Sequence, residues 1–242
     1  MFMAAKISII FQSSKLFRVN YANLRLSFNR CVIRPVFGQD HSSHICAVYP
    51  RFFVDLATIR TFASSNDKKK METEWILLRP WQDSDAETLF KYASDPDVGP
   101  RAGWPPHKSV EDSLEIIRTV FNAEGMWAVI WKESGEAIGG VGYLPASASN
   151  LKIAEDHAEV GYWIARPYWG KGICTEALLM VIDYCFNEKG FTTLWGDYFP
   201  SNPASGRVME KCGFVDTGEE TICPNLEVGS DCPVRVMKLI KK

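Results

Sequence analysis

The segment between residues 159 and 177 constrains the fold of this chain more than any other stretch. An apolar run over residues 158–165 predicts a strand, and a strongly apolar run over residues 173–187 predicts a helix. Only a short turn containing Gly170 and Gly172 separates them. Glycine adopts left-handed backbone conformations and lets a ligand approach the main chain closely. This arrangement predicts an α/β fold with a ligand at the turn.

The start of the predicted helix is suited to binding an anion. The first amides of a helix have no hydrogen-bond partner inside it, and the helix dipole makes that end attractive to negative charge. The turn therefore predicts a cradle for a pyrophosphate group. A plain tight turn is the alternative, because a Gly-Lys-Gly sequence before a helix is weak evidence by itself.

Two well-known phosphate-binding loops do not fit this segment. A Walker A loop needs a leading glycine and a Ser or Thr after its lysine, whereas this chain has Ala165 and Gly172 at those positions. The dinucleotide fingerprint needs a third glycine, whereas this chain has Thr175. A nucleotide-binding domain is therefore disfavoured.

Residues 71–242 alternate between predicted strands and helices. Helices come first, an antiparallel meander follows, and a strand–helix–strand crossover completes an α/β pattern. Asp83 and Ser109 are expected to start the first two helices, and residues 98–106 are expected to form a loop. We expect strands at 75–79, 126–132, 137–144, 158–165, 192–198, 214–217 and 234–240, and helices at 84–93, 110–121, 173–187 and 203–212.

The first 70 residues differ from the rest. Their first sixty contain eight Lys or Arg but only two acids, Asp40 and Asp55. Organellar transit peptides have such an acid-poor, basic composition, and a disordered extension is the alternative. We therefore expect an N-terminal extension over residues 1–70 and one domain over 71–242. The expected location is the cytoplasm, or an organelle if the extension is a transit peptide.

Charge and cysteine content exclude several kinds of partner and site. The formal net charge of −2 gives no general attraction to nucleic acid or to an anionic membrane. No apolar run reaches the roughly 18 residues that a membrane span needs. The seven cysteines include no C-x-x-C pair, which argues against a zinc ribbon and favours reduced thiols. We expect no metal site.

A second segment, residues 202–214, begins Asn-Pro-Ala-Ser-Gly-Arg and ends Lys-Cys-Gly-Phe, which predicts a short helix between two strands. Together with the glycine turn, it resembles the GNAT acetyltransferases, and in particular the ribosomal-protein N-terminal acetyltransferases of the RimJ/RimL type. Residues 77–81 and 95–98 also resemble that branch. The resemblance covers about residues 73–240. It implies a mostly antiparallel central sheet, flanked by helices, whose fourth and fifth strands splay apart.

The resemblance implies that the glycine turn binds the pyrophosphate of acetyl-CoA, the co-substrate of the family. Trp169 stands where the general pattern has Gln or Arg, and Cys174 stands where Gly or Ala is usual. Lys171 is expected either to add charge at the phosphates or to be a solvated lysine. The implied contacts are the segment Gly170, Lys171, Gly172, Ile173, Cys174 and Thr175.

The resemblance also implies a course for the pantetheine arm of CoA. The arm is expected to lie in the gap between the splayed strands and to pair with the main chain near Trp163, Ile164 and Ala165. Asn202 resembles the residue that holds this arm. A helix N-cap before Pro203 is an equally good interpretation of Asn202.

The implied reaction is the attack of a neutral amine on a thioester, which needs a base for the amine proton and a donor for the leaving thiolate. Ser205 lies where relatives have a candidate donor hydroxyl, with helix first-turn hydrogen bonding as its alternative. Glu159 is the first candidate base, acting through water, and Asp197 is the second. A surface carboxylate is the alternative for Glu159.

The acceptor is expected to be a primary amine, with a protein N-terminus favoured. An α-amine has a pKa of about 7.7–8.0, so roughly a tenth to a fifth of it is neutral at pH 7. The neutral fraction of a lysine side chain at the same pH is below about a thousandth. A site with one modest carboxylate therefore suits an α-amine. The alternatives are a small-molecule amine acetyltransferase and a module that binds acyl-CoA without turnover, which Cys174 favours.

Overall fold

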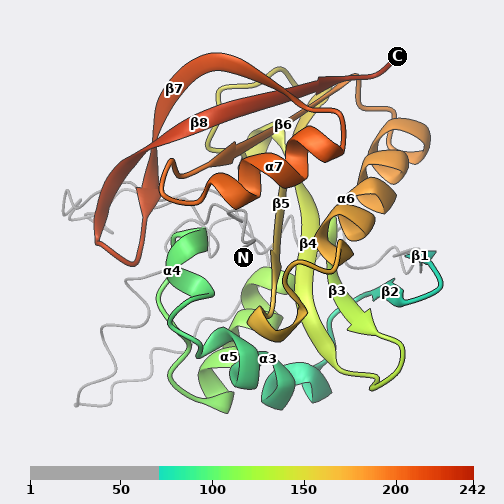
Figure 1. Ribbon diagram of the computed structural model, residues 1–242, viewed down its shortest axis with the longest axis vertical. Coiled ribbons are helices and arrows are strands. Elements are labelled where there is room, and N and C mark those ends of the chain that lie inside the picture. Colours follow the sequence, from blue (N-terminus) through green and yellow to red (C-terminus); the bar gives the residue numbers. More distant parts are fainter. Residues whose placement is uncertain (1–70) are drawn as a thin grey trace, which may run out of the picture.

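The computed structural model describes residues 71–242 (Figure 1). The predicted extension, residues 1–70, lies outside the described residues, so the division at residue 71 stays a prediction. Among the described residues, no helix is long and apolar enough to cross a membrane.

One eight-stranded sheet forms the centre of the fold, with strands in the order β1-β2-β3-β4-β5-β6-β8-β7. Neighbouring strands are antiparallel except β5 and β6, which are parallel. The predicted mixed, mostly antiparallel sheet is confirmed. The strands are β1 (Met71–Glu72), β2 (Ile76–Arg79), β3 (Met126–Trp131), β4 (Ala137–Pro145), β5 (His157–Ile164), β6 (Thr193–Tyr198), β7 (Val215–Asn225) and β8 (Ser230–Ile240).

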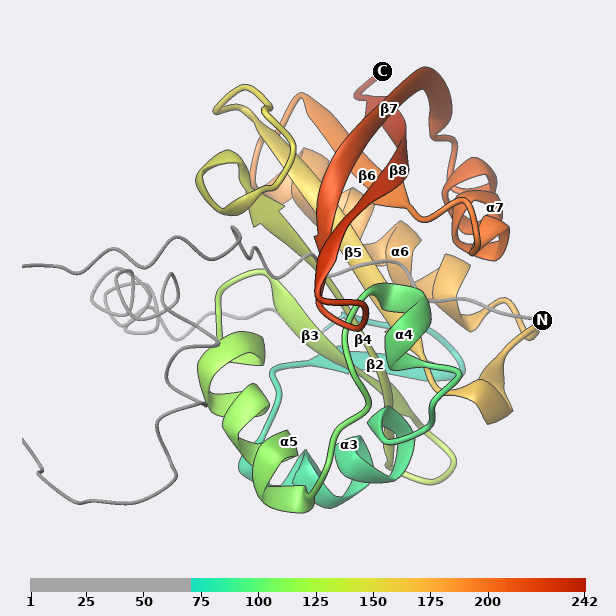
Figure 2. The same ribbon diagram turned by 90° about the vertical axis from the view of Figure 1, so that its left-hand side faces the viewer.

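Helices cover both faces of this sheet. The helices before β3 lie on one face, and those that follow β5 and β6 lie on the other (Figure 2). The first group is α3 (Ala86–Ala93), α4 (Gly99–Ala102) and α5 (Val110–Ile116), and the second is α6 (Ile173–Asp183) and α7 (Pro203–Lys211). π-helical turns extend α5 through Phe121 and α6 through Glu188.

The predicted helix starts are correct in one case and wrong in the other. Ser109 caps α5, since its side chain accepts a hydrogen bond from the Asp112 amide at 3.1 Å. Asp83 does not cap the first helix. The chain enters a 3₁₀ turn at Gln82, whose amide donates to the Asp85 carboxylate, while the Asp83 carboxylate pairs with Arg118.

Two elements are larger than the sequence predicts. Residues 98–106, expected to be a loop, contain α4, which ends at Gly103 in a left-handed conformation. The last two strands form a long hairpin, because β7 runs eight residues beyond the predicted Thr217. Gly218, Pro224 and the register shift between Asp216 and Glu220 interrupt the alternation by which a strand is recognised.

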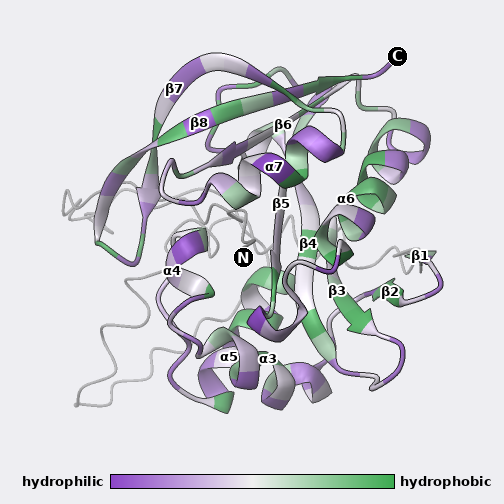
Figure 3. Ribbon diagram, viewed as in Figure 1, coloured by the Kyte–Doolittle hydropathy of each residue, from purple (hydrophilic) through white to green (hydrophobic). Residues whose placement is uncertain are grey.

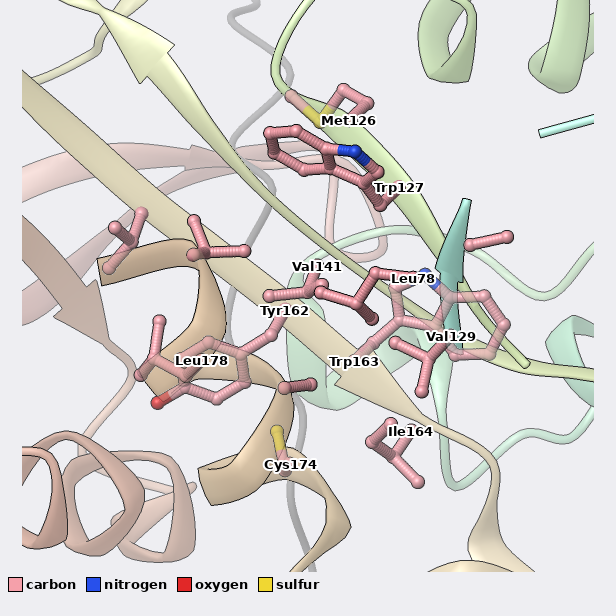
Figure 4. Packing of buried hydrophobic residues seen from close by; sticks show 14 of the residues in the cluster. Leu78, Met126, Trp127, Val129, Val141, Tyr162, Trp163, Ile164, Cys174 and Leu178 are labelled. Atoms are coloured by element: carbon pink, nitrogen blue, oxygen red, sulfur yellow. The ribbon is translucent and has the colours of Figure 1, made fainter. Parts of the chain in front are cut away.

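Large apolar side chains fill the space between the sheet and α6. Hydrophobic residues gather along β3, β4 and α6 (Figure 3). Trp127, Tyr162 and Leu178 are fully buried in this core. Tyr162 extends from β5 beside Leu178 and Cys174 of α6 (Figure 4). This packing fixes the start of α6 against β5, so the glycine turn between them has a defined position.

Candidate active site

The strands β5 and β6 separate after a short paired region. Their register covers only three positions, from His157 opposite Thr193 to Glu159 opposite Trp195. Both strands continue beyond it, β5 to Ile164 and β6 to Tyr198. The predicted splay between the family's fourth and fifth strands is therefore present, between β5 and β6.

The main chain of β5 presents alternate residues to this gap. Just beyond the end of β5, the amide of Ala165 donates to the carbonyl of Ile138 on β4, so the main-chain groups of Ala165 point toward β4. Hydrogen-bonding directions alternate along a strand. Tyr162 and Ile164 consequently direct their main-chain groups toward the gap, and Trp163, opposite Gly140, directs its groups toward β4. Of the three residues expected near pantetheine, Ile164 is the one whose main chain faces the gap.

The turn between β5 and α6 is open to a ligand. Gly170 and Gly172 have φ values of 76° and 82°, and nothing lies within 4 Å of a Cβ placed on either residue. The Glu176 amide donates to the Gly172 carbonyl and so closes the first turn of α6. The amides of the three residues before Glu176 thus lie at the open end of the helix, which suits an anionic pyrophosphate.

Trp169 ties this turn to the end of β5. Its indole nitrogen donates to the carbonyl oxygen of Ile164 at 2.5 Å. The ammonium of Lys171 lies 5.2 Å from the centroid of the Tyr168 ring, a cation–π contact that holds the lysine at the edge of the turn.

The side chains after the turn belong to the core. Ile173 and Cys174 are buried, and Cys174 lies beside Tyr162 (Figure 4). Burial raises the pKa of the Cys174 thiol well above its usual value, so the thiol stays protonated. The Cys174 side chain, at the position where Gly or Ala is usual, thus lies inside the core and away from the open end of the helix.

Asn202 connects the start of α7 to α4. Its side chain is buried, and the amide nitrogen donates to the carbonyl of Arg101 at 3.2 Å. Asn202 is the N-cap residue of α7, with Pro203 in the first turn. Its side chain makes no capping hydrogen bond, while its main-chain carbonyl accepts from the Ser205 amide at 3.0 Å. The predicted N-cap position before Pro203 is therefore confirmed, although the Asn202 side chain donates to α4 instead of capping α7.

Ser205 is fully buried on the α7 side of the gap. The hydroxyl of Tyr162 donates to the carbonyl oxygen of Ser205 at 2.8 Å and lies 3.2 Å from its Oγ. Sequence patterns did not single out this contact, because the two residues are 43 positions apart and meet only through packing of α7 on β5.

Glu159 is buried on the opposite face of β5, with only 1% of its surface exposed. Successive strand side chains alternate between faces, and Glu159 is three residues from Tyr162. Its Oε2 accepts from the Ser149 hydroxyl at 2.6 Å and from the Asn150 amide at 3.1 Å. The surface-carboxylate alternative is therefore wrong. Neither Ser149 nor Asn150 belongs to a motif that marks it as a partner of this carboxylate.

Asp197 lies on the same face as Glu159, because it is two residues beyond Trp195, the register partner of Glu159. It is 2% exposed, and its Oδ2 accepts from the Cys223 thiol at 3.2 Å. Cys223 belongs to a small apolar cluster beside this carboxylate, made of Leu151, Phe199, Cys223, Val234 and Val236.

The tip of the β7–β8 hairpin closes over this end of the molecule. It lies against α4 (Figure 2), and the Leu226 amide donates to the Gly103 carbonyl at 2.7 Å. The gap is thus bordered by β5, β6, α7 and, through Asn202, the α4 segment. Within residues 71–242, no three or more metal-binding side chains cluster in a way that could hold a metal ion.

The sequence of residues 76–215 matches the family model for the acetyltransferase (GNAT) domain, which is more than half of the chain. The chain therefore belongs to the GNAT acetyltransferase family and is an acetyltransferase, as its two motifs predicted. Members of this family use acetyl-CoA as co-substrate.

Several bacterial proteins are similar in sequence. The Bacillus subtilis protein YkkB is 34% identical over 158 residues, which are 62% of this chain and 87% of YkkB. The [ribosomal protein uS5]-alanine N-acetyltransferase of Escherichia coli is 26% identical over 167 residues, which are 65% of this chain and 84% of that enzyme.

Solved structures share the fold. A GNAT-family acetyltransferase from Bacillus anthracis superposes with a TM-score of 0.60 at 22% identity, over 71% of this chain and 98% of that protein. A ribosomal-protein-S5-alanine acetyltransferase from Vibrio fischeri superposes with a TM-score of 0.54 at 24% identity, over 72% of this chain and 97% of that protein. These likenesses bear out the predicted GNAT fold.

Proposed function

We propose that this acetyltransferase moves the acetyl group of acetyl-CoA to a primary amine, and that the favoured acceptor is the α-amine of a protein N-terminus. The observation that carries the proposal is the splay of β5 from β6 beside an open glycine turn. Glu159 and Ser205 lie near this gap, on opposite faces of the sheet. The similarity to a [ribosomal protein uS5]-alanine N-acetyltransferase supports the choice of acceptor.

The donor is proposed to occupy the turn and the gap. Main-chain amides from Gly170 to Thr175 bind the pyrophosphate, and Lys171 adds positive charge at the rim. The pantetheine arm follows the gap along Ile164 and passes Asn202. The open space over both glycines supports this assignment, since a bulky phosphate group needs close access to the main chain.

The chemistry is direct transfer. The amine nitrogen attacks the thioester carbonyl, and its proton passes to Glu159 through water. The C–N bond forms, the C–S bond breaks, and the Ser205 hydroxyl gives its proton to the leaving sulfur. Glu159 releases the amine proton to solvent water, from which Ser205 regains a proton. Glu159 is preferred to Asp197 because a hydroxyl and an amide fix one of its oxygens, whereas Oδ2 of Asp197 accepts from the weak thiol donor of Cys223.

The choice of an α-amine is supported by how much of each amine is neutral at pH 7. An α-amine is roughly a tenth to a fifth neutral at pH 7, so one carboxylate is enough to complete its deprotonation. A lysine side chain is almost fully protonated at pH 7, so its deprotonation needs a much stronger base. Small-molecule amines remain the competing acceptor class.

The test mixes the full chain with acetyl-CoA and an acceptor panel, and follows release of the CoA thiol. Three related peptides separate the amines: one with a free N-terminus and a lysine, one with a blocked N-terminus and the same lysine, and one with a free N-terminus and the lysine replaced. Polyamines and small amines complete the panel.

Thiol release with both free-N-terminus peptides, and none with the blocked peptide, is the expected result. Release with the blocked peptide or with a small amine would replace the proposed acceptor. Binding of acetyl-CoA without release for any acceptor would favour a binding-only module, for which the buried Cys174 no longer provides an argument.

A further inference from the structure

Tyr162 lies at the junction between the splayed strand β5 and the helix that carries Ser205. The phenol is completely buried, and so is Ser205. Its oxygen lies within hydrogen-bond distance of two Ser205 atoms, the carbonyl oxygen at 2.8 Å and Oγ at 3.2 Å. The phenol is thus in direct contact with the Ser205 hydroxyl.

The direction of these two hydrogen bonds follows from the hydrogens available. A carbonyl oxygen only accepts, so the single phenol hydrogen is directed to it. The phenol oxygen then accepts from the Ser205 hydroxyl across 3.2 Å. Burial raises the pKa of Tyr162 well above its usual value, so the phenol keeps its hydrogen. The pair therefore has one consistent arrangement, which orients the serine.

The first turn of α7 also rests on the other splayed strand. A Cβ at Gly206 would come within 2.8 Å of the Tyr198 ring, so the glycine lets the helix lie directly on that ring. The turn is thus attached to β5 through the Tyr162 hydroxyl and to β6 through the Tyr198 ring. Ser205 is held across the gap between two strands that no longer pair with each other.

From this geometry we propose that Tyr162 is a positioning residue for acetyl transfer, which holds the Ser205 hydroxyl where the CoA sulfur departs. The inference rests on the proposed role of Ser205. The long 3.2 Å contact is readily exchanged for a hydrogen bond to the developing thiolate, because charged acceptors form stronger bonds. Tyr162 itself does not touch the reacting atoms.

A double-mutant cycle tests this relationship. Steady-state rates are measured for the full chain and for Tyr162→Phe, Ser205→Ala and the double variant, at saturating acceptor and varied acetyl-CoA. Tyr143→Phe is the matched control, because Tyr143 is another buried tyrosine, on β4. Phenylalanine fills the same volume, and a melting curve for each variant reports any loss of folding.

We expect Ser205→Ala to lower kcat by about 100-fold, within the range of general acid catalysis, and Tyr162→Phe by about tenfold. The KM for acetyl-CoA should stay within about twofold, and the double variant should match Ser205→Ala, since an absent hydroxyl needs no positioning. Tyr143→Phe should keep the wild-type kcat.

Three results would overturn the inference. A wild-type kcat for Tyr162→Phe shows that orientation is not limiting, while the proposed function stands. Losses that multiply in the double variant show that Tyr162 acts independently of Ser205. A wild-type kcat for Ser205→Ala removes the serine from the proposed mechanism, and the role of Tyr162 with it.

Discussion

The indole nitrogen of Trp169 donates to the carbonyl oxygen of Ile164, at 2.5 Å. This contact joins the start of the glycine turn to the last residue of β5, so the turn is closed by a side chain. The general family pattern has Gln or Arg at this position, and the tryptophan here supplies a hydrogen-bond donor with a large apolar surface. The bond also occupies a carbonyl at the edge of the gap.

Replacing Trp169 by Phe should weaken acetyl-CoA binding while leaving the chemical step intact. A hydrogen bond of this kind contributes about 0.5–1.5 kcal/mol, so the Kd for acetyl-CoA should rise roughly two- to tenfold. Calorimetric titration measures it. Trp131→Phe is the control, because the Trp131 indole nitrogen donates to the exposed Glu133 and phenylalanine keeps an aromatic ring against Tyr168. An unchanged Kd for Trp169→Phe would show that the turn keeps its shape without this bond.

Replacing Gly172 by Ala should impair donor binding through the backbone. A non-glycine residue in the left-handed region costs about 1–2 kcal/mol, so the turn would relax away from its φ of 82°. We expect the KM for acetyl-CoA to rise about tenfold.

Gly135 provides a matched control for that substitution. It lies between β3 and β4 with a φ of 72°, and a Cβ placed on it would have nothing within 4 Å. Gly135→Ala should therefore lower the melting temperature about as much as Gly172→Ala does, but it should not alter the KM for acetyl-CoA. Equal KM values for the two variants would argue that the turn does not contact the donor.

The two buried carboxylates can be separated by isosteric amides. Glu159→Gln should lower kcat by about 100-fold or more, as expected for loss of a general base. Asp197→Asn should stay within about threefold of wild type. The reverse order of losses would assign the base to Asp197.

Much of the fold could be predicted from sequence because its signals are local. Hydrophobic alternation located β3 to β6, and the Gly-Lys-Gly turn located the start of α6. The length of the terminal hairpin could not be predicted, since β7 is mostly exposed and so lacks a buried stripe. The short α4 follows from contacts of Gly103 and Arg101 with Leu226 and Asn202, which are distant in sequence.

The candidate site likewise contains residues that local motifs predict and residues that they do not. Motifs pointed to the glycine turn and to Glu159, Asp197, Asn202 and Ser205, but not to the groups that hold these side chains. Ser149 is in a loop ten residues before Glu159, and nothing in its local sequence marks it as a hydrogen-bond donor to a carboxylate. Such partners are chosen by tertiary packing, which periodicity does not encode.

His107 should make the folded state sensitive to mild acid. Its Nδ1 lies 2.8 Å from the hydroxyl of the buried Ser113, and its ring lies 5.3 Å from the Trp104 ring. Burial lowers the pKa of His107 to about 4, although the Asp112 carboxylate partly opposes this shift. The histidine is therefore neutral in the folded protein at physiological pH.

The sign of the effect follows from the two pKa values. Between about pH 6.5 and pH 4 the unfolded chain binds a proton at His107 and the folded chain does not, so the free energy of unfolding falls as the pH is lowered. From about pH 7 to about pH 4.5 this one group should remove about 2 kcal/mol. Other groups contribute to acid sensitivity, so the comparison has to be made against His107→Gln.

Urea unfolding of the full chain and of His107→Gln at about pH 7 and about pH 4.5 isolates this contribution. Glutamine keeps a polar group for Ser113 but does not titrate, so the variant should lose about 2 kcal/mol less than wild type between the two pH values. The comparison of differences cancels the constant cost of the substitution itself. Identical losses in the two proteins would mean that His107 takes up its proton equally well folded and unfolded, and that burial against Ser113 and Trp104 does not hold it neutral.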